Sequence, residues 1–260
     1  MTMTEALTGL HPVLVELTVA PTLNFAMEQC GVPLVSAVRV QNLAAEPLVG
    51  ARLSVRLSPD LGDATILVVD TVLGGESAYF ASVDIRLPPG RLRAVVEAER
   101  AQLAWELGVG ETVVATGHQN VELLAFNEWP GLRAPPALLA SFVMPNHPVV
   151  AQLLRQTRDR LAKATGDNAL SGYQSRSPKR VLESVQALVG AFQDLGISYI
   201  GLPASFEAVG QKVRLPDMVL SDGMGNCLDI SLLLAGCLEQ MGLAPLLVLV
   251  RGHAFPAVWL

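Results

Sequence analysis

The chain has few cysteines, few aromatic residues and few charges for its length. Of its 260 residues, only three are cysteine, 5% are aromatic and 16% are charged. Three cysteines, an odd number, exclude a small fold that is held together by disulfide bonds. The low charge and the 51% of hydrophobic residues exclude a disordered chain. They also provide enough apolar side chains for a substantial core.

Basic residues are scarce, and lysine is missing from the first half. The formal net charge is −6 and the pI is near 5.2, which argues against a protein that binds nucleic acid mainly through charge. Residues 1–126 hold seven arginines and 14 acidic residues, a net charge of −7. Residues 127–260 hold 11 basic and 10 acidic residues, a net charge of +1. This asymmetry favours two units of different character.

No long hydrophobic run is free of interruptions. The most apolar stretch, residues 228–250, contains the charged residues Asp229 and Glu239. Gly242 and Pro245 divide it, so it favours a buried helix and a strand over a membrane span. The first residues lack the basic and apolar regions of a secretory signal. We therefore expect a cytoplasmic protein with reduced cysteines and no membrane contact.

The first half shows the two-residue hydrophobic alternation of β-strands. Strand-like runs cover residues 13–19, 34–40, 52–57, 65–72, 79–87, 103–107 and 121–126. Turn-forming residues separate these runs, and this spacing predicts an all-β, immunoglobulin-like sandwich over residues 8–126. The prediction rests on pattern alone, because Cys30 is the only cysteine here and no Cys…Trp…Cys signature exists.

A second domain is expected after a linker. Residues 127–136 are rich in proline and glycine, which is typical of a linker. Hydrophobic residues at helical spacing follow within residues 137–260. One helix is expected after the cap signals Asn146 and Pro148, and another between Ser177-Pro178 and Gly196. The apolar helix from residue 228 to Gly242 comes next, and then two strands over 246–250 and 254–260.

Residues that can perform chemistry gather near the end of the chain. Cys227 is expected in the first turn of the apolar helix, where free backbone N–H groups and positive potential favour a thiolate. The path of helix, strand and turns can return His253, 26 residues later, to the start of that helix. A thiol beside an imidazole is the minimal pair of nucleophile and base. A buried, inert cysteine and a structural histidine are the plainer alternatives.

This region resembles the core of the transglutaminase-like (papain-like) cysteine hydrolases. In that superfamily a Gly-x-Cys-x-Asp/Glu motif opens the core helix, and a later strand begins His-Ala-Trp/Phe after a glycine turn. The matching stretches here are Gly225 to Asp229, Gly242 to Pro245 and His253 to Phe255. The resemblance implies an α+β domain that acts on a peptide or protein. It implies Cys227 and His253 as catalytic residues, with Asn226 and Asp229 in support.

The third residue of the family's site has no match. That residue is usually Asp or Asn on the strand after the histidine strand, but only seven residues follow His253 and none is polar. Asp229 is a poor substitute, because two residues along a helix turn it about 200° away from Cys227. Three alternatives remain: the residue lies beyond Leu260 and the domain is truncated at its C-terminus, the pair acts as a dyad, or the site is inactive.

A wider resemblance rests on five stretches of the chain. They read VELTVAPTLNFAMEQCGVPLVSAVRVQN, NEWPG, SGYQS, PASFEAVGQKVRLP and GHAFPAVWL. Together they resemble the N-terminal region of large bacterial proteins that continue into a superfamily 1 DNA helicase and a restriction-endonuclease-like domain. The resemblance implies that this chain is a fragment whose partner is the remainder of such a protein. It leaves a second function open, a non-catalytic recognition module.

Neither a cofactor nor a metal is expected. The chain contains no Gly-x-x-x-x-Gly-Lys-Ser/Thr motif for ATP, and Cys227, Cys237 and His253 lack the spacing of a zinc site. Basic residues recur along one expected helix, at Arg155, Arg158, Arg160 and Lys163. They fit a phosphate-binding surface or, more simply, a solvated face. Direct contact with nucleic acid is therefore not expected.

Overall fold

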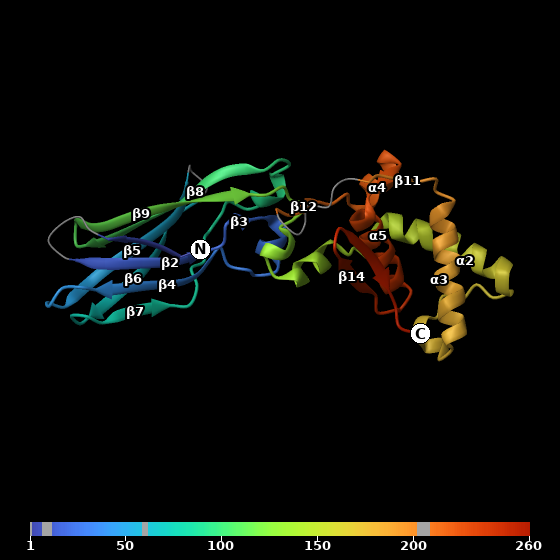
Figure 1. Cartoon of the computed structure of the whole chain (residues 1–260), viewed down its shortest axis with the longest axis horizontal. Helices are drawn as coiled ribbons and strands as arrows, with labels where there is room; N and C mark the ends of the chain where they lie inside the picture. The colour runs from blue at the N-terminus through green and yellow to red at the C-terminus, as the bar shows by residue number, and fades with distance from the viewer. Residues whose placement is uncertain (1, 7–11, 59–61, 202–208) are drawn as a thin grey trace. The chain divides into compact units, whose positions relative to one another are not determined.

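The computed structural model in Figure 1 divides into two compact units, Met1–Phe126 and Asn127–Leu260. It describes residues 2–6, 12–58, 62–201 and 209–260. The predicted start of the first domain at residue 8, and part of the stretch PASFEAVGQKVRLP, lie outside the described residues. None of the described helices combines the length and the hydrophobicity that a membrane crossing requires.

The first unit is built from two β-sheets. One has the strand order β1-β2-β4-β7, made by Thr2–Ala6, Val13–Val19, Val35–Asn42 and Ser77–Phe80. The other has the order β3-β9-β8-β5-β6, made by Thr22–Leu23, Thr112–Leu123, Glu99–Val109, Leu48–Ser58 and Thr65–Val72. Neighbouring strands are antiparallel except β3 and β9. The short helices α1 (Phe25–Gln29) and η1 (Leu92–Ala94) complete the described elements.

Alternating side chains from both sheets form the core of the first unit. On β2, four alternate residues are buried: Val13, Val15, Leu17 and Val19. On β8, Leu103, Trp105 and Leu107 are buried, while their neighbours are half-buried or exposed. Trp105 lies against Gly117 of β9, where a Cβ atom would come within 2.4 Å of the indole ring. Glycine at this position therefore lets a large aromatic side chain enter the core.

One predicted strand is shorter than expected. The alternation over residues 79–87 predicts a strand, but β7 ends at Phe80 and only Val83 forms an isolated bridge, with Val35. The alternating hydrophobic residues of this segment pack against the first unit without forming a strand. Val83 is buried, and together with Ile85 and Leu87 it lines a cavity.

The second unit is mainly helical. Its α-helices are α2 (Pro148–Thr165), α3 (Pro178–Gln193), α4 (Pro216–Asp222) and α5 (Cys227–Gln240), and its 3₁₀ helices are η2 (Gly131–Arg133), η3 (Pro136–Phe142) and η4 (Gly172–Ser175). Three small sheets join β10 (Glu128–Trp129) to β12 (Gln211–Lys212), β11 (Ser198–Tyr199) to β13 (Met224–Gly225), and β14 (Leu246–Val250) to β15 (His253–Ala257). The core packs α2, α3 and α5 together around residues such as Leu153, Leu188 and Leu233.

The helix starts agree with the sequence patterns more closely than the helix ends do. Ser177 caps α3 and Pro178 is its first residue, as predicted, but the helix ends at Gln193, before Gly196. The cap of α2 is His147 rather than Asn146, because the His147 Nδ1 atom accepts the Val149 N–H at 3.3 Å. The last strand, β15, ends at Ala257 and does not continue to Leu260.

Residues 127–136 differ from the expected linker, because they belong to the second unit. The Asn127 side chain donates a hydrogen bond to the Val213 carbonyl at 2.7 Å, and the Val213 N–H donates to the Asn127 carbonyl at 2.8 Å. Trp129 pairs with Gln211 and is fully buried. Burial of this indole depends on a partner strand 82 residues later in the chain. It fixes a segment whose proline and glycine content is typical of a linker.

Candidate functional site

Cys227 is the first residue of α5. The preceding residue, Asn226, is the N-cap, and its side-chain oxygen accepts the N–H groups of Leu228 at 2.9 Å and Asp229 at 3.0 Å. The Asp229 carboxylate accepts the Asn226 N–H in return, at 3.0 Å. This reciprocal capping box fixes the start of the helix. The half-buried Cys227 side chain therefore projects from a rigid position.

The buried Asp229 side chain also holds the start of α5 in place. Its side chain is fully buried, and its Oδ1 atom accepts the backbone N–H of Arg214 at 2.8 Å. The Arg214 guanidinium lies 3.3 Å from the other carboxylate oxygen and also reaches Asp222 at 3.4 Å. A buried carboxylate needs such partners to offset the loss of water. Asp229 thus ties the segment before α4 to the start of α5.

Ser231 connects the start of α5 to the strand that carries His253. Its hydroxyl lies 2.6 Å from the carbonyl oxygen of Cys227 and 3.1 Å from that of Ala254. Both carbonyls are therefore within hydrogen-bond reach of one hydroxyl. The fold brings the main chain at residues 253–254 to the cysteine end of the helix, as the predicted path requires.

The imidazole of His253 is not paired with the Cys227 thiol. Its side chain is exposed, whereas the neighbouring Ala254 side chain is buried. Because successive side chains of a strand point to opposite faces, His253 shares a face with Phe255, and their ring centroids lie 6.3 Å apart. Within the described residues no hydrogen bond joins His253 to Cys227. The main chain at Cys227 and the main chain next to His253 are close together. The side chains of the two residues are not in contact.

Tyr199 is a member of this site that the sequence did not suggest. Strands β11 and β13 run parallel, with Tyr199 beside Gly225, two residues before Cys227. Desolvation raises the pKa of Tyr199, and the charge of Cys227 and a side-chain hydrogen bond with it add to the increase. The phenol therefore keeps its proton near neutral pH and can donate it to sulfur. Only the pairing of two-residue strands far apart in sequence reveals this contact.

The other two cysteines lie in different surroundings. Cys30 is exposed in the first unit, and Cys237 is buried in the middle of α5. Burial raises the pKa of the Cys237 thiol to about 12, so this thiol stays protonated near neutral pH. All three cysteines are free. Cys227 alone combines partial access with a helix N-terminus.

The start of α5 offers hydrogen-bond donors to an incoming group. Asn226 occupies the N–H groups of Leu228 and Asp229, and no described residue accepts the N–H of Cys227 itself. Tyr199 is the second candidate donor, because Cys227 contributes to the raised pKa of its phenol. Two donors beside a nucleophile are the elements of an oxyanion site. Among the described residues, no group of three His, Cys, Asp or Glu side chains is arranged to hold a metal ion.

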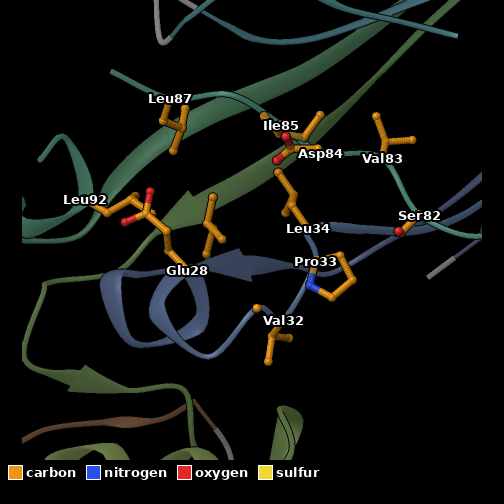
Figure 2. A pocket seen from close by; sticks show the side chains of 12 residues that line it. Glu28, Val32, Pro33, Leu34, Ser82, Val83, Asp84, Ile85, Leu87 and Leu92 are labelled. Atoms are coloured by element: carbon orange, nitrogen blue, oxygen red, sulfur yellow. The ribbon is translucent and has the colours of Figure 1, made fainter. Parts of the chain in front are cut away.

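A cavity of about 260 Å³ lies in the first unit. Figure 2 shows that Glu28 of α1 and Asp84 of the segment after β7 reach it from separate elements, with apolar side chains such as Leu34 and Leu92 in its wall. Both acidic residues are exposed. The sequence patterns did not predict this cavity, because it forms where segments distant in sequence meet.

The basic residues of α2 and α3 are partly engaged within the second unit. Arg160 forms two hydrogen bonds with the Asp194 carboxylate, at 2.8 and 2.7 Å. This bidentate contact raises the pKa of Arg160 and lowers the pKa of Asp194. Arg180 pairs with Asp167 at 2.9 Å. These ion pairs reduce the positive charge that the helix surface offers to a phosphate.

Comparison with known proteins adds little. No protein-family model matches the chain, and no curated protein matches it either. Among solved structures, similarity is found to a family 76 glycoside hydrolase from a bovine Bacteroides thetaiotaomicron strain, with 9% sequence identity and a TM-score of 0.16. That match covers 49% of this chain and 22% of the other. With so low a TM-score, it gives no argument about fold or function.

Proposed function

We propose that the second unit is a cysteine-dependent hydrolase or acyl transferase that acts on amide or peptide bonds, with Cys227 as its nucleophile. The observation that carries the proposal is the position of Cys227. Its thiol is half-buried at the first residue of a capped helix, close enough to Tyr199 to contribute to the raised pKa of that phenol. Free N–H groups at a helix start favour both a thiolate and a developing oxyanion.

The proposed reaction has two steps. The Cys227 sulfur attacks the carbonyl carbon, and the carbon–nitrogen bond breaks as His253 delivers to the leaving amine the proton that it took from the thiol. The Cys227 N–H and the Tyr199 hydroxyl stabilise the negative oxygen of the tetrahedral intermediate. Water or an acceptor amine then attacks the thioester carbon, which releases the acyl group and regenerates the thiol.

This proposal requires the imidazole to turn. His253 is exposed and lies on the face of β15 opposite to the buried Ala254, so the residue must change its orientation before its ring reaches Cys227. The Ser231 hydroxyl lies within hydrogen-bond reach of the carbonyls of both Cys227 and Ala254, so the two segments are already close together. Substrate binding over the exposed face is the step that would supply the change. Without a third residue to orient the ring, we propose a dyad in these residues.

The same reasoning extends to fold family and context. We infer an immunoglobulin-like sandwich for the first unit, since it has two sheets with one buried face each. We infer a transglutaminase-like domain for the second, since the cysteine helix precedes a hairpin that begins its second strand with histidine. The resemblance of the chain to helicase–nuclease proteins supports a role within such a larger protein. A cytoplasmic location is consistent with three free cysteines.

A peptide carrying an electrophilic acyl group tests the proposal. We expect the wild-type chain to form a covalent adduct that mass spectrometry maps to Cys227, and the variant Cys227→Ala to form none there. His253→Ala is expected to slow adduct formation at least about tenfold, in line with the loss of a general base. The matched control His118→Ala, in the first unit, leaves the rate unchanged. Adducts that form equally on Cys30 and Cys227 contradict the proposal.

A non-catalytic recognition module is the second candidate. The exposed position of His253, on the same face as Phe255, favours it, since a paired catalytic imidazole is normally held by a partner. In that case the unit binds a target through its surface and Cys227 is structural. The experiment above distinguishes the two candidates. A recognition module forms no selective adduct at Cys227, and the variant His253→Ala does not change its rate of adduct formation.

A further inference from the structure

The segment after β7 crosses from one sheet of the first unit to the other. Val83 bridges Val35 of β4, in the four-stranded sheet. One residue later, the Asp84 carbonyl accepts a hydrogen bond from the hydroxyl of Thr65, the first residue of β6 in the five-stranded sheet. The cavity of about 260 Å³ lies where this segment separates from residues 31–34, the loop before β4.

The wall of this cavity is mainly apolar. Leu23 of β3, Leu34 and Leu92 of η1 are buried in it, and Ile85 and Leu87 are half-buried. Figure 2 shows the segment after β7 on one side of this space, and α1 with its following loop on the other. An apolar cavity of about 150 Å³ can hold benzene, whereas drug-sized ligands occupy about 300–1,000 Å³. The cavity therefore suits a small organic molecule.

The charges that line the cavity are negative. Among the described lining residues Glu28 and Asp84 are acidic, and none is lysine, arginine or histidine. The described residues provide no ion-pair partner for Glu28. Asp84 lies 3.7 Å from Arg86, but both side chains are about four-fifths exposed, at 84% and 79%, where an ion pair contributes little. The net charge of −7 over residues 1–126 adds to the attraction for a cation.

We propose that this cavity binds a small primary amine, a protonated ammonium group on a short apolar body. The body packs against the leucine and isoleucine side chains of the wall, where its removal from water supplies most of the affinity. The ammonium group donates hydrogen bonds to the Glu28 and Asp84 carboxylates, which supply the selectivity for a cation. The proposal is independent of the chemistry proposed for Cys227.

The lining favours a primary amine over other cations. Quaternary ammonium groups are recognised by aromatic cages, and none of the described lining residues is aromatic. A bare calcium ion takes six to eight oxygen ligands, but the described residues contain no group of three acidic, histidine or cysteine side chains arranged to hold a metal ion. A primary ammonium group has three N–H donors for carboxylate oxygens. Its apolar body also uses the wall, which a metal ion leaves empty.

NMR titration of the ¹⁵N-labelled full chain with benzylamine, benzyl alcohol and benzoate tests the proposal. These probes share a ring and differ in charge. Benzylamine is expected to bind with a dissociation constant of about 1–10 mM, in line with its size, and to shift the amide signals of residues 28–34 and 82–87. Benzyl alcohol is expected to bind about fivefold more weakly, and benzoate more weakly still. Benzyltrimethylammonium, which keeps the charge but has no N–H group, is expected to bind at least about threefold more weakly than benzylamine.

Three variants test the role of the charges. The double variant E28Q/D84N removes both carboxylates with little change of shape. It is expected to weaken benzylamine binding at least about fivefold and to leave benzyl alcohol binding within about twofold. R86Q removes the cation that competes for Asp84 and is expected to strengthen benzylamine binding about twofold. I85S makes the wall more polar and is expected to weaken both probes about threefold.

The matched control E111Q makes the same kind of charge change in the turn before β9. Leu23 of the cavity pairs with Leu123 at the other end of that strand, so E111Q is expected to leave benzylamine binding unchanged. Circular dichroism must give the same spectrum for all variants. The proposal is overturned if benzylamine at about 50 mM, well above the expected range, shifts none of the signals named above. It is also overturned if benzoate binds as tightly as benzylamine, or if E28Q/D84N binds benzylamine like the wild type.

Discussion

The two units use their buried polar side chains in different ways. In the first unit, Asn24 and Asn42 are fully buried; Asn24 caps α1, and Asn42 holds the turn after β4 and also bonds to Val72 of β6. In the second unit, Asn226, Asp229 and Ser231 are buried within six residues of one another, and they join α5 to two other segments. Buried polar groups are costly unless they are hydrogen-bonded. Their concentration marks the start of α5 as the most constrained point of the second unit.

Both units leave apolar side chains uncovered, including Ile66 and Val68 of the edge strand β6 in the first unit, at 57% and 56% exposure. Strands of the first unit belong to sheets of four and five strands, whereas β14 and β15 form a sheet of two. On this hairpin Leu246, Val250 and Phe255 are each more than 40% exposed. The buried polar residues at the start of α5 and the exposed apolar residues of the β14–β15 hairpin thus lie in the same unit.

The largest effect is expected from Asp229→Ala. This change leaves the N–H groups of Asn226 and Arg214, and the Arg214 guanidinium, without their buried acceptor. We expect the second unit to lose about 3 kcal/mol of unfolding free energy. Urea denaturation followed by a probe in each unit measures the loss. The exposed control Asp159→Ala is expected to change it by less than about 0.5 kcal/mol.

Asn42→Ala makes the same comparison in the first unit. The Asn42 side chain donates to the carbonyls of Glu46 at 2.7 Å and Val72 at 2.9 Å, and accepts the Ala44 N–H at 3.0 Å. Loss of this side chain is expected to lower the unfolding free energy of the first unit by about 2 kcal/mol. The second unit is expected to keep its stability. A loss of similar size in both units for either variant contradicts the division into separate cores.

Asn226→Ala is expected to have a smaller effect. It removes one N-cap acceptor but leaves the Asp229 carboxylate in place. Loss of an N-cap costs about 1 kcal/mol. The same urea experiment measures it, and Asn226→Asp, which keeps the acceptor oxygen, is the matched variant. If both variants lose the same stability, the cap is not the cause.

Local patterns in the sequence predict the local features of this structure. The alternation at residues 13–19 and the helix signals at Ser177 and Pro178 agree with β2 and α3. The cysteine stands at the first residue of α5, because the N-cap Asn226 and the apolar run after it are encoded within a few residues. For such features, the residues that matter are neighbours in the chain.

Features that depend on distant partners were not predictable in this way. Burial of Trp129 depends on β12, so the composition of residues 127–136 suggested a linker instead. Tyr199 reaches Cys227 only because β11 pairs with β13. The exposed orientation of His253 follows from the alternation of β15, which begins at that residue. Pairing of short strands leaves little trace in composition or periodicity.

The smallest effect concerns the titration of Tyr199. Its pKa is raised in the folded chain, chiefly by desolvation and then by Cys227, so the unfolded chain loses this proton first as pH rises past about 10. The second unit should therefore lose a little stability above that pH. The absorbance of ionised tyrosine at about 295 nm, in the wild type minus Tyr199→Phe, reports the pKa. Cys227→Ser is expected to lower it partway, and no change contradicts the contact.

The rates at which the three cysteines are alkylated test the central claim, that Cys227 is a nucleophile, most directly. Peptide-mapped labelling of the folded chain with iodoacetamide near neutral pH gives each rate separately. We expect Cys227 to react faster than Cys30, although Cys30 is the more exposed. Cys237, whose pKa burial raises to about 12, should react only after unfolding. A Cys227 that reacts no faster than Cys30 would contradict the account.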